Sequence, residues 1–188
     1  MEITNHYKET VNLKDNAVLN YDIKSNASAR LFFCNHEGFD LNINVNLHEN
    51  ATCEMYGFFK SNGKNANVVT TVTHNGKKSK CDQDFRFINK ESNSSFQGKI
   101  TIPKNITGCE SNMLNKNLLL DTDSTAFSKP ELDINNDDTV CTHGSTTGPI
   151  DKDQIFYLRS RGIDEQSAVD ILIEAFYQDI KYKMSIDQ

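Results

Sequence analysis

Two Cys-x-His pairs are the residues of this chain best suited to hold a metal. They are Cys34 with His36 and Cys141 with His143. On a β-strand, residues i and i+2 point to the same face, so each pair presents a thiolate and an imidazole together. Iron, iron–sulfur clusters and zinc accept this mixture of ligands. Free cysteines are also often buried as small apolar side chains, so plain packing is the competing interpretation.

The sequence lacks the motifs of several other kinds of site. Neither GxxxxGK[ST] nor GxGxxG occurs, so we expect this chain to bind no nucleotide. GxSxG is also absent, which removes support for a hydrolase elbow. The five cysteines form no CxxC, so neither a zinc ribbon nor a thioredoxin motif is present. Their odd number and the lack of a signal segment predict free thiols in a reducing cytoplasm.

Length, charge and composition narrow the class of protein. The 188 residues suit one domain, or one domain with a short appendage. The net charge of -6 argues against a nucleic-acid binder, and no apolar run approaches the roughly 18 residues that span a membrane. The 22 asparagines favour turns over helix interiors, which indicates a mostly β protein. The acidity is concentrated in residues 121–188, which hold 14 acids and 6 bases.

The elements that must position these groups are short strands. Apolar residues and asparagines alternate strictly over residues 41–47, the period of a half-buried strand. Two architectures fit strands at this spacing: an antiparallel sandwich with Asn75-Gly76 as a hairpin turn, or a parallel β-helix with asparagines at its corners. Periodicity alone does not separate them. Further strands are predicted at residues 52–59, 67–73, 80–88, 95–102, 117–120, 132–134 and 139–142.

The last forty residues are helical in character. Asp151 lies three residues before Gln154, as in an acidic capping box, and predicts a helix over residues 151–161 closed by Gly162. A second helix is predicted from Asp164 to about Lys181. Its apolar stripe either covers the β core or docks a partner. The stripe comprises Ala168, Ile171, Leu172, Ala175 and Phe176, widened by Val169, Ile173 and Ile180.

These patterns divide the chain into three regions. Residues 1–30 are weakly patterned and predict a loose or edge-like start. Residues 31–148 form the β core, and residues 149–188 form the helical region.

The second Cys-x-His pair lies within a longer stretch that resembles the signature of the SufB/SufD family. This chain has KPELDI at 129–134, DDTVCTHGSTTG at 137–148 and DKDQIFYLRSRGI at 151–163. The family pattern is KPxLEI, DDVxCxHGATxG and DExQxFYLRSRGI. Upstream, NKNLLL at 115–120 and FQGKI at 96–100 resemble the family's NxNLLL and FxGKI. The resemblance is dense from about residue 96 to 180, and the chain is short for the family.

The resemblance implies a fold and a role. The fold is a right-handed parallel β-helix followed by C-terminal helices, mainly β overall. The role is that of a non-enzymatic scaffold in the SUF machinery for iron–sulfur cluster assembly. Family members pair through their β-helices, as SufB–SufD heterodimers or as homodimers, and dock the ABC-type ATPase SufC through the C-terminal helices. The docking candidates implied here are Phe156, Ile171, Leu172 and Phe176.

The resemblance also implies a site for a transient iron–sulfur cluster or iron. The family places a functional histidine at the interface between the two β-helix subunits, and it maps to His143. ATP-driven movement of SufC would expose this imidazole and a thiol. Gly144 follows it, as in the SufD branch, whereas the SufB branch has a glutamate there. The SufB branch also has a cysteine in a QCDS element, and the alignment places Leu114 at that position. Cys109-Glu110-Ser111 resembles CDS but lies about five residues earlier, an offset that a loop around Thr107-Gly108 could absorb, so Cys109 is a second thiol candidate beside Cys141.

Two other functions remain open on the sequence. One is a degenerate or truncated family member that only stabilises a longer paralogue. The other is a β-helix carbohydrate-active enzyme, for which Asp82 with Asp84, or Asp137 with Asp138, would be the paired carboxylates.

Overall fold

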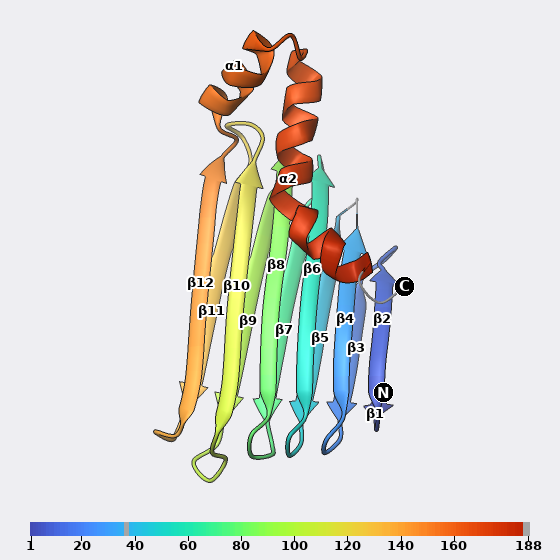
Figure 1. Ribbon diagram of the computed structural model, residues 1–188, viewed down its shortest axis with the longest axis vertical. Coiled ribbons are helices and arrows are strands. Elements are labelled where there is room, and N and C mark those ends of the chain that lie inside the picture. The colour runs from blue at the N-terminus through green and yellow to red at the C-terminus, as the bar shows by residue number, and fades with distance from the viewer. Residues whose placement is uncertain (36–37, 186–188) are drawn as a thin grey trace.

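Two sheets of parallel strands make up most of the protein (Figure 1). The structure is a computed structural model and describes residues 1–35 and 38–185. Along the first sheet, here sheet A, the order is β1 (Glu2–Ile3), β3 (Ala17–Ile23), β5 (Phe39–Leu47), β7 (Ala66–His74), β9 (Asn93–Ile102) and β11 (Thr125–Ile134). Along sheet B it is β12 (Thr139–Pro149), β10 (Cys109–Leu119), β8 (Lys80–Lys90), β6 (Thr52–Asn62), β4 (Ser28–Asn35) and β2 (His6–Asn12). Two helices follow, α1 (Lys152–Ser160) and α2 (Glu165–Ser185).

This arrangement is a parallel β-solenoid. Successive strands alternate between the two sheets, and every strand pairs in parallel with the strand two places along the chain. The parallel β-helix prediction is therefore confirmed, and the antiparallel sandwich is wrong. Asn75-Gly76 is not a hairpin turn, because it connects β7 in sheet A to β8 in sheet B. The right-handed sense of the coil stays a prediction.

A repeated left-handed corner connects sheet A to sheet B. Asn26, Asn50, Lys78 and Gly108 have φ of 62°, 55°, 57° and 70°, and each lies in the same turn of a successive coil. The backbone N–H of Asn26 donates to Glu49 O, that of Asn50 to Lys77 O, and that of Lys78 to Thr107 O. Glycine adopts this conformation at low cost and asparagine more readily than most residues, so Asn26, Asn50 and Gly108 suit these corners.

The solenoid starts earlier than the sequence pattern indicated. Strands β1, β2 and β3 occupy much of residues 1–30, so the start of the chain is not loose. It is edge-like, the other form the sequence allowed, because β1 and β2 are the edge strands of their sheets. The pattern in β2 is weak because polar Glu9 is half-buried, where it accepts a hydrogen bond of 2.9 Å from Tyr21 Oη. A charged residue at such a position disguises the alternation of a strand.

Aromatic side chains fill the middle of the core. The Phe85 ring is fully buried and stacks on Phe33, Phe59 and Phe96, with centroids 5.2–6.3 Å apart. Gly57 lies between Phe33 and Phe85 in register, and a Cβ there would approach Phe85 Cδ1 to 2.3 Å. The glycine thus makes room for a ring from the neighbouring coil.

The two helices lie differently on this solenoid. Asp151 caps α1 by accepting hydrogen bonds from the backbone N–H groups of Asp153 and Gln154, as its spacing predicted. No residue of α1 is buried, whereas α2 crosses the outer face of sheet B over β8, β6 and β4 (Figure 1). The predicted helices are confirmed, and α2 runs four residues beyond Lys181.

Candidate functional site at the open end of the solenoid

The last coil of the solenoid has one uncovered side. Strand β12 pairs with β10 and β11 pairs with β9, and both are the outermost strands of their sheets. We call the free side of β11 and β12 the open end. Side chains that would be sealed by a following coil are accessible here, so inward-facing residues of β12 can meet solvent or a partner.

Strand β12 brings Cys141 and His143 to one face. In register, Cys141 lies beside Ser111 and His143 beside Met113, and both neighbours are buried residues of β10. Cys141 and His143 therefore occupy core-facing positions of the terminal coil. Cys141 is half-buried and packs against the core, whereas His143 is exposed.

The Cys141 thiol is shielded rather than activated. Burial raises its pKa, the nearby Cys109 adds to the rise, and a hydrogen bond from the Ser111 backbone opposes it. A thiol of this kind binds a metal or sulfur only when it can lose its proton to that metal or to a base. His143, two residues along the same face, is the nearest imidazole on this strand, and neutral imidazole is both a base and an iron ligand.

Cys109 lies one coil further in and is sealed. It is 1% exposed, and its Sγ lies 3.5 Å from Ser79 Oγ and 3.6 Å from Gly76 O. The same Ser79 hydroxyl is 2.7 Å from His74 Nδ1. The structure thus places Cys109 in a buried polar corner, behind Cys141 rather than beside His143 on the surface.

The sequence also suggested Cys34, Asp82 and Asp84 as chemical groups. Of the first Cys-x-His pair, Cys34 is half-buried and His36 lies outside the described residues. Asp84 is engaged by Arg86, so it is not a free member of a carboxylate pair with Asp82. Within residues 1–35 and 38–185, no three His, Cys, Asp or Glu side chains gather into a group that could hold a metal ion.

The helices form an apolar groove away from the sheet. Tyr157 and Leu158 of α1 and Ile171 and Leu172 of α2 line a hollow of about 380 Å³, and we call these four residues the docking groove. Ile171 and Leu172 were docking candidates on the sequence, whereas Tyr157 and Leu158 were not. Ile171 is 44% exposed, so the apolar stripe is only partly used for packing.

The two remaining docking candidates lie elsewhere on the helices. Phe156 of α1 is 73% exposed and does not line the groove. Phe176 is half-buried and faces the sheet, where its ring lies 5.9 Å from the Arg86 guanidinium.

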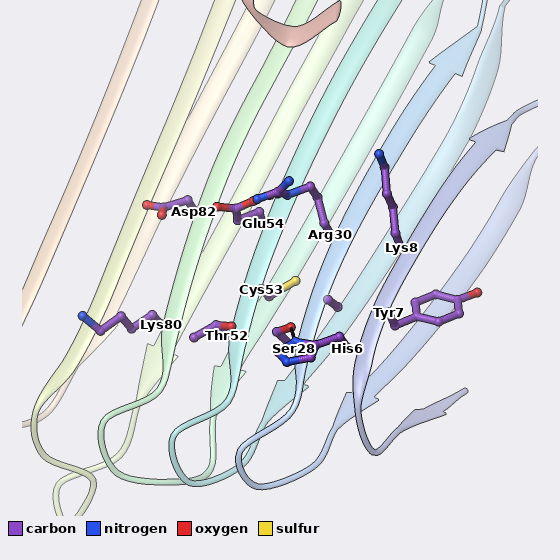
Figure 2. Close-up of a pocket in the computed structure, with 11 residues that line it drawn as sticks. His6, Tyr7, Lys8, Ser28, Arg30, Thr52, Cys53, Glu54, Lys80 and Asp82 are labelled. Atoms are coloured by element: carbon purple, nitrogen blue, oxygen red, sulfur yellow. Dashed lines mark hydrogen bonds and ion pairs between the residues drawn. The ribbon is translucent and has the colours of Figure 1, made fainter. Parts of the chain in front are cut away.

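A polar hollow of about 670 Å³ occupies the outer face of sheet B near the starts of β2, β4, β6 and β8 (Figure 2). Arg30 and Glu54 point toward each other across it and form an ion pair (Figure 2). Asp82 lines this hollow, but Cys141, His143 and Cys109 do not, so the hollow is separate from the open end. None of the helices in the described part of the chain is both long and apolar enough to cross a membrane.

Fold and site together define a parallel β-solenoid that presents an imidazole and a thiol on its uncovered last coil and carries a helical extension. Comparison with known proteins gives its family. The model of the SufBD core domain, described as "SUF system FeS cluster assembly", matches residues 1–176, so the chain belongs to the SufBD core family.

Curated relatives agree with this family. The chain is 42% identical to the iron–sulfur cluster assembly protein SufD of Escherichia coli over 85 residues. These residues make up 45% of this chain and 20% of that protein. It is 39% identical over 85 residues to the SufBD family protein slr0076 of Synechocystis, covering 19% of that protein. It is 39% identical over 92 residues to the SufBD family protein ML0594 of Mycobacterium leprae, covering 24%. The matched stretch is thus about a fifth to a quarter of each relative.

Proposed function

We propose that this chain is a non-enzymatic scaffold subunit of a SUF-type iron–sulfur cluster assembly complex in the cytoplasm. It pairs through its open end with a SufB/SufD-type paralogue or a second copy of itself. It docks a SufC-type ABC ATPase through the docking groove. The iron–sulfur cluster, or iron, is cargo that is held transiently at the seam between subunits.

The observation that carries this proposal is the exposed imidazole of His143 beside the half-buried thiol of Cys141 on the uncovered coil. Iron–sulfur clusters are usually held by four protein ligands. One chain contributes two donors at the open end, so a second subunit at the same end would complete the set. The unpaired edges of β11 and β12 offer backbone groups for such pairing.

The docking groove supports the second half of the proposal. Tyr157 is 57% exposed and Ile171 is 44% exposed, so a partner could cover apolar surface there without unfolding either helix. Aromatic and aliphatic side chains in a shallow hollow are the usual anchors of a protein interface.

Replacement of the imidazole tests the cluster site. His143→Ala should leave the circular-dichroism spectrum and unfolding unchanged, because the side chain is exposed, and should abolish cluster assembly in a complementation assay and in anaerobic reconstitution. Thr142→Ala is the matched control, since Thr142 lies on the same strand but on its opposite face. Full assembly by His143→Ala would remove His143 from the site.

A charge in the docking groove tests the ATPase partner. Ile171→Glu should prevent co-purification with a SufC-type ATPase, because a carboxylate would have to lose its hydration on binding. Tyr182→Glu is the control: Tyr182 is also on α2, is 67% exposed, and lies outside the groove. Equal co-purification of both variants would contradict this docking site. A chain that binds a longer paralogue but no ATPase and no cluster would instead be a degenerate member that stabilises its partner.

A further inference from the structure

An ion-pair network fastens α2 to the outer face of sheet B. Arg86 of β8 is 3% exposed and binds two carboxylates at once. Its Nε and Nη2 donate to both oxygens of Asp84 at 3.0 and 2.6 Å, and its Nη1 and Nη2 donate to both oxygens of Asp179 at 2.5 and 2.6 Å. Nη1 also donates to the backbone oxygen of Phe176 at 2.5 Å. We call Arg86, Asp84 and Asp179 the Arg86 clasp.

The clasp holds the second half of α2 on the outer face of sheet B. The first half lies at the ends of β6 and β8, where Ile173 lines a hollow together with Asn62 and Lys90. Near it, Tyr177 stacks on Phe58 of β6 at 3.9 Å, and Ile180 is buried against Phe32 and Tyr56. The docking groove lies at the start of α2, where the helix stands beyond the ends of the strands together with α1 (Figure 1). A partner in the groove would therefore contact the first half of a helix whose second half is fixed to sheet B.

The clasp is connected to the open end by two ladders of hydrogen bonds. In register, Asp84 of β8 lies beside Leu114 of β10, and Leu114 lies beside Gly144 of β12. Gly144 directly follows His143. Two strand spacings span about 10 Å, and both pairings are continuous over most of each strand. Strands β8 and β10 thus connect the anchor of α2 to β12, the strand that carries the imidazole.

We propose that Arg86 and Asp179 are positioning residues that make α2 and the last coil move as one rigid body. A partner bound in the docking groove would then shift β12, the strand that carries His143. This inference deepens the proposed function and rests on it for the identity of the partner. Its physical basis is a buried cation shared by two carboxylates, one from each element. Such a bidentate pair fixes orientation as well as distance.

The chain offers a mild way to open the clasp. Asp179→Asn removes the charge that comes from α2 and leaves Arg86 paired with Asp84, so no buried cation is left uncompensated. Asp179→Glu keeps the charge and serves as the conservative variant. Glu174→Gln is the matched control, because Glu174 is a carboxylate on α2 that binds Lys181 and Tyr177 instead of the sheet.

Amide hydrogen exchange on the chain alone tests the clasp without any ATPase. Asp179→Asn should speed exchange in residues 173–184 by about tenfold, the factor expected for one hydrogen bond to a charged group. Coupling requires that residues 139–149 also exchange faster, by about threefold, while residues 39–47 stay unchanged. Asp179→Glu should restore most of the protection, and Glu174→Gln should match the wild type. Faster exchange in α2 with an unchanged β12, or no change in either, would overturn the inference.

The reconstituted complex with a SufC-type ATPase gives the second readout. Asp179→Asn should bind the ATPase with unchanged affinity and unchanged ATP turnover but yield less assembled cluster, because docking no longer reaches His143. Equal cluster yield in Asp179→Asn and wild type would overturn the coupling. If the wild-type chain failed to bind the ATPase, the proposed function would fail, and the exchange of β12 would still decide whether the clasp couples the two elements.

Discussion

An interior coil and the last coil hold the same kinds of side chain in different states. His74 ends β7 in the interior and is fully buried, with Nδ1 2.7 Å from Ser79 Oγ. Its Nε2 has no hydrogen-bond partner among the described residues, and burial lowers the pKa of the ring to about 4. His143, on a core-facing position of β12, is exposed. Whether a ligand can reach an imidazole therefore depends on whether a further coil covers its strand, and not on the residue type.

The thiols repeat the contrast. Cys53 and Cys81 are register neighbours on β6 and β8 and are 2% and 1% exposed. A hydrogen bond between the Cys81 thiol and Cys53, and then burial, raise the pKa of Cys81 well above its usual value. Cys141 occupies the same row, two strands beyond Cys81, and is only half-buried. The interior thiols are packing groups, whereas the terminal thiol is within reach of a ligand.

The largest expected difference between the two regions is in packing. Phe85→Ala should lower the free energy of unfolding by about 3–5 kcal/mol, because it empties a fully buried ring site. Phe127→Ala on β11 should cost less than about 0.5 kcal/mol, since that ring is 56% exposed. Urea denaturation followed by circular dichroism measures both. Equal losses would show that the last coil is packed as tightly as the interior.

The next effect is the response of the interior to acid. The pKa of His74 in the folded state lies below the ordinary value of about 6.5, so the unfolded chain takes up the proton first as the pH falls. The free energy of unfolding is therefore unaffected by His74 above about pH 6.5. It falls by about 3 kcal/mol as the pH is lowered toward 4. His74→Asn should flatten the stability curve between these values in urea denaturation at successive pH values. An unchanged slope would mean that His74 is not the group responsible.

The smallest effect concerns reactivity and leaves stability unchanged. Cys141 should react with iodoacetamide in the native protein, more slowly than a free thiol because burial raises its pKa. Cys53 and Cys81 should react only after unfolding. Mass spectrometry of peptides from native and urea-treated protein distinguishes them. Native labelling of Cys81 would contradict the sealed interior.

Much of the fold was predictable because its apolar residues alternate. The strict pattern over residues 41–47 predicted β5, and the capping spacing of Asp151 predicted α1. The parallel arrangement came from the family resemblance, since periodicity did not distinguish it from a sandwich. In β10 the pattern failed over its first eight residues because several inward side chains are polar. Asn115, for example, is 1% exposed and donates to Phe85 O at 3.0 Å, a bond that hydropathy does not reveal.

The orientation of α2 was predictable only in part. The apolar stripe included Ile171 and Ala175, which are exposed, whereas the face that contacts the sheet includes Tyr177 and Asp179. The helix is held by an aromatic stack and an ion pair, and a count of apolar residues detects neither. Arg86 and Asp179 are 93 positions apart, so no local pattern joins them. The one local signal was Asp84 two residues before Arg86 on the same face of a strand.

The left-handed corners have a consequence for how such a chain can change length. Since the corners at Asn26, Asn50 and Lys78 each donate to the equivalent corner of the following coil, a whole coil is an interchangeable building block. Duplicating one coil ahead of β11 would carry the imidazole outward by one strand spacing, about 4.8 Å, while its own neighbours stayed the same. Inserting part of a coil would instead turn the outward residues inward. Length variation in this architecture is therefore expected in complete turns.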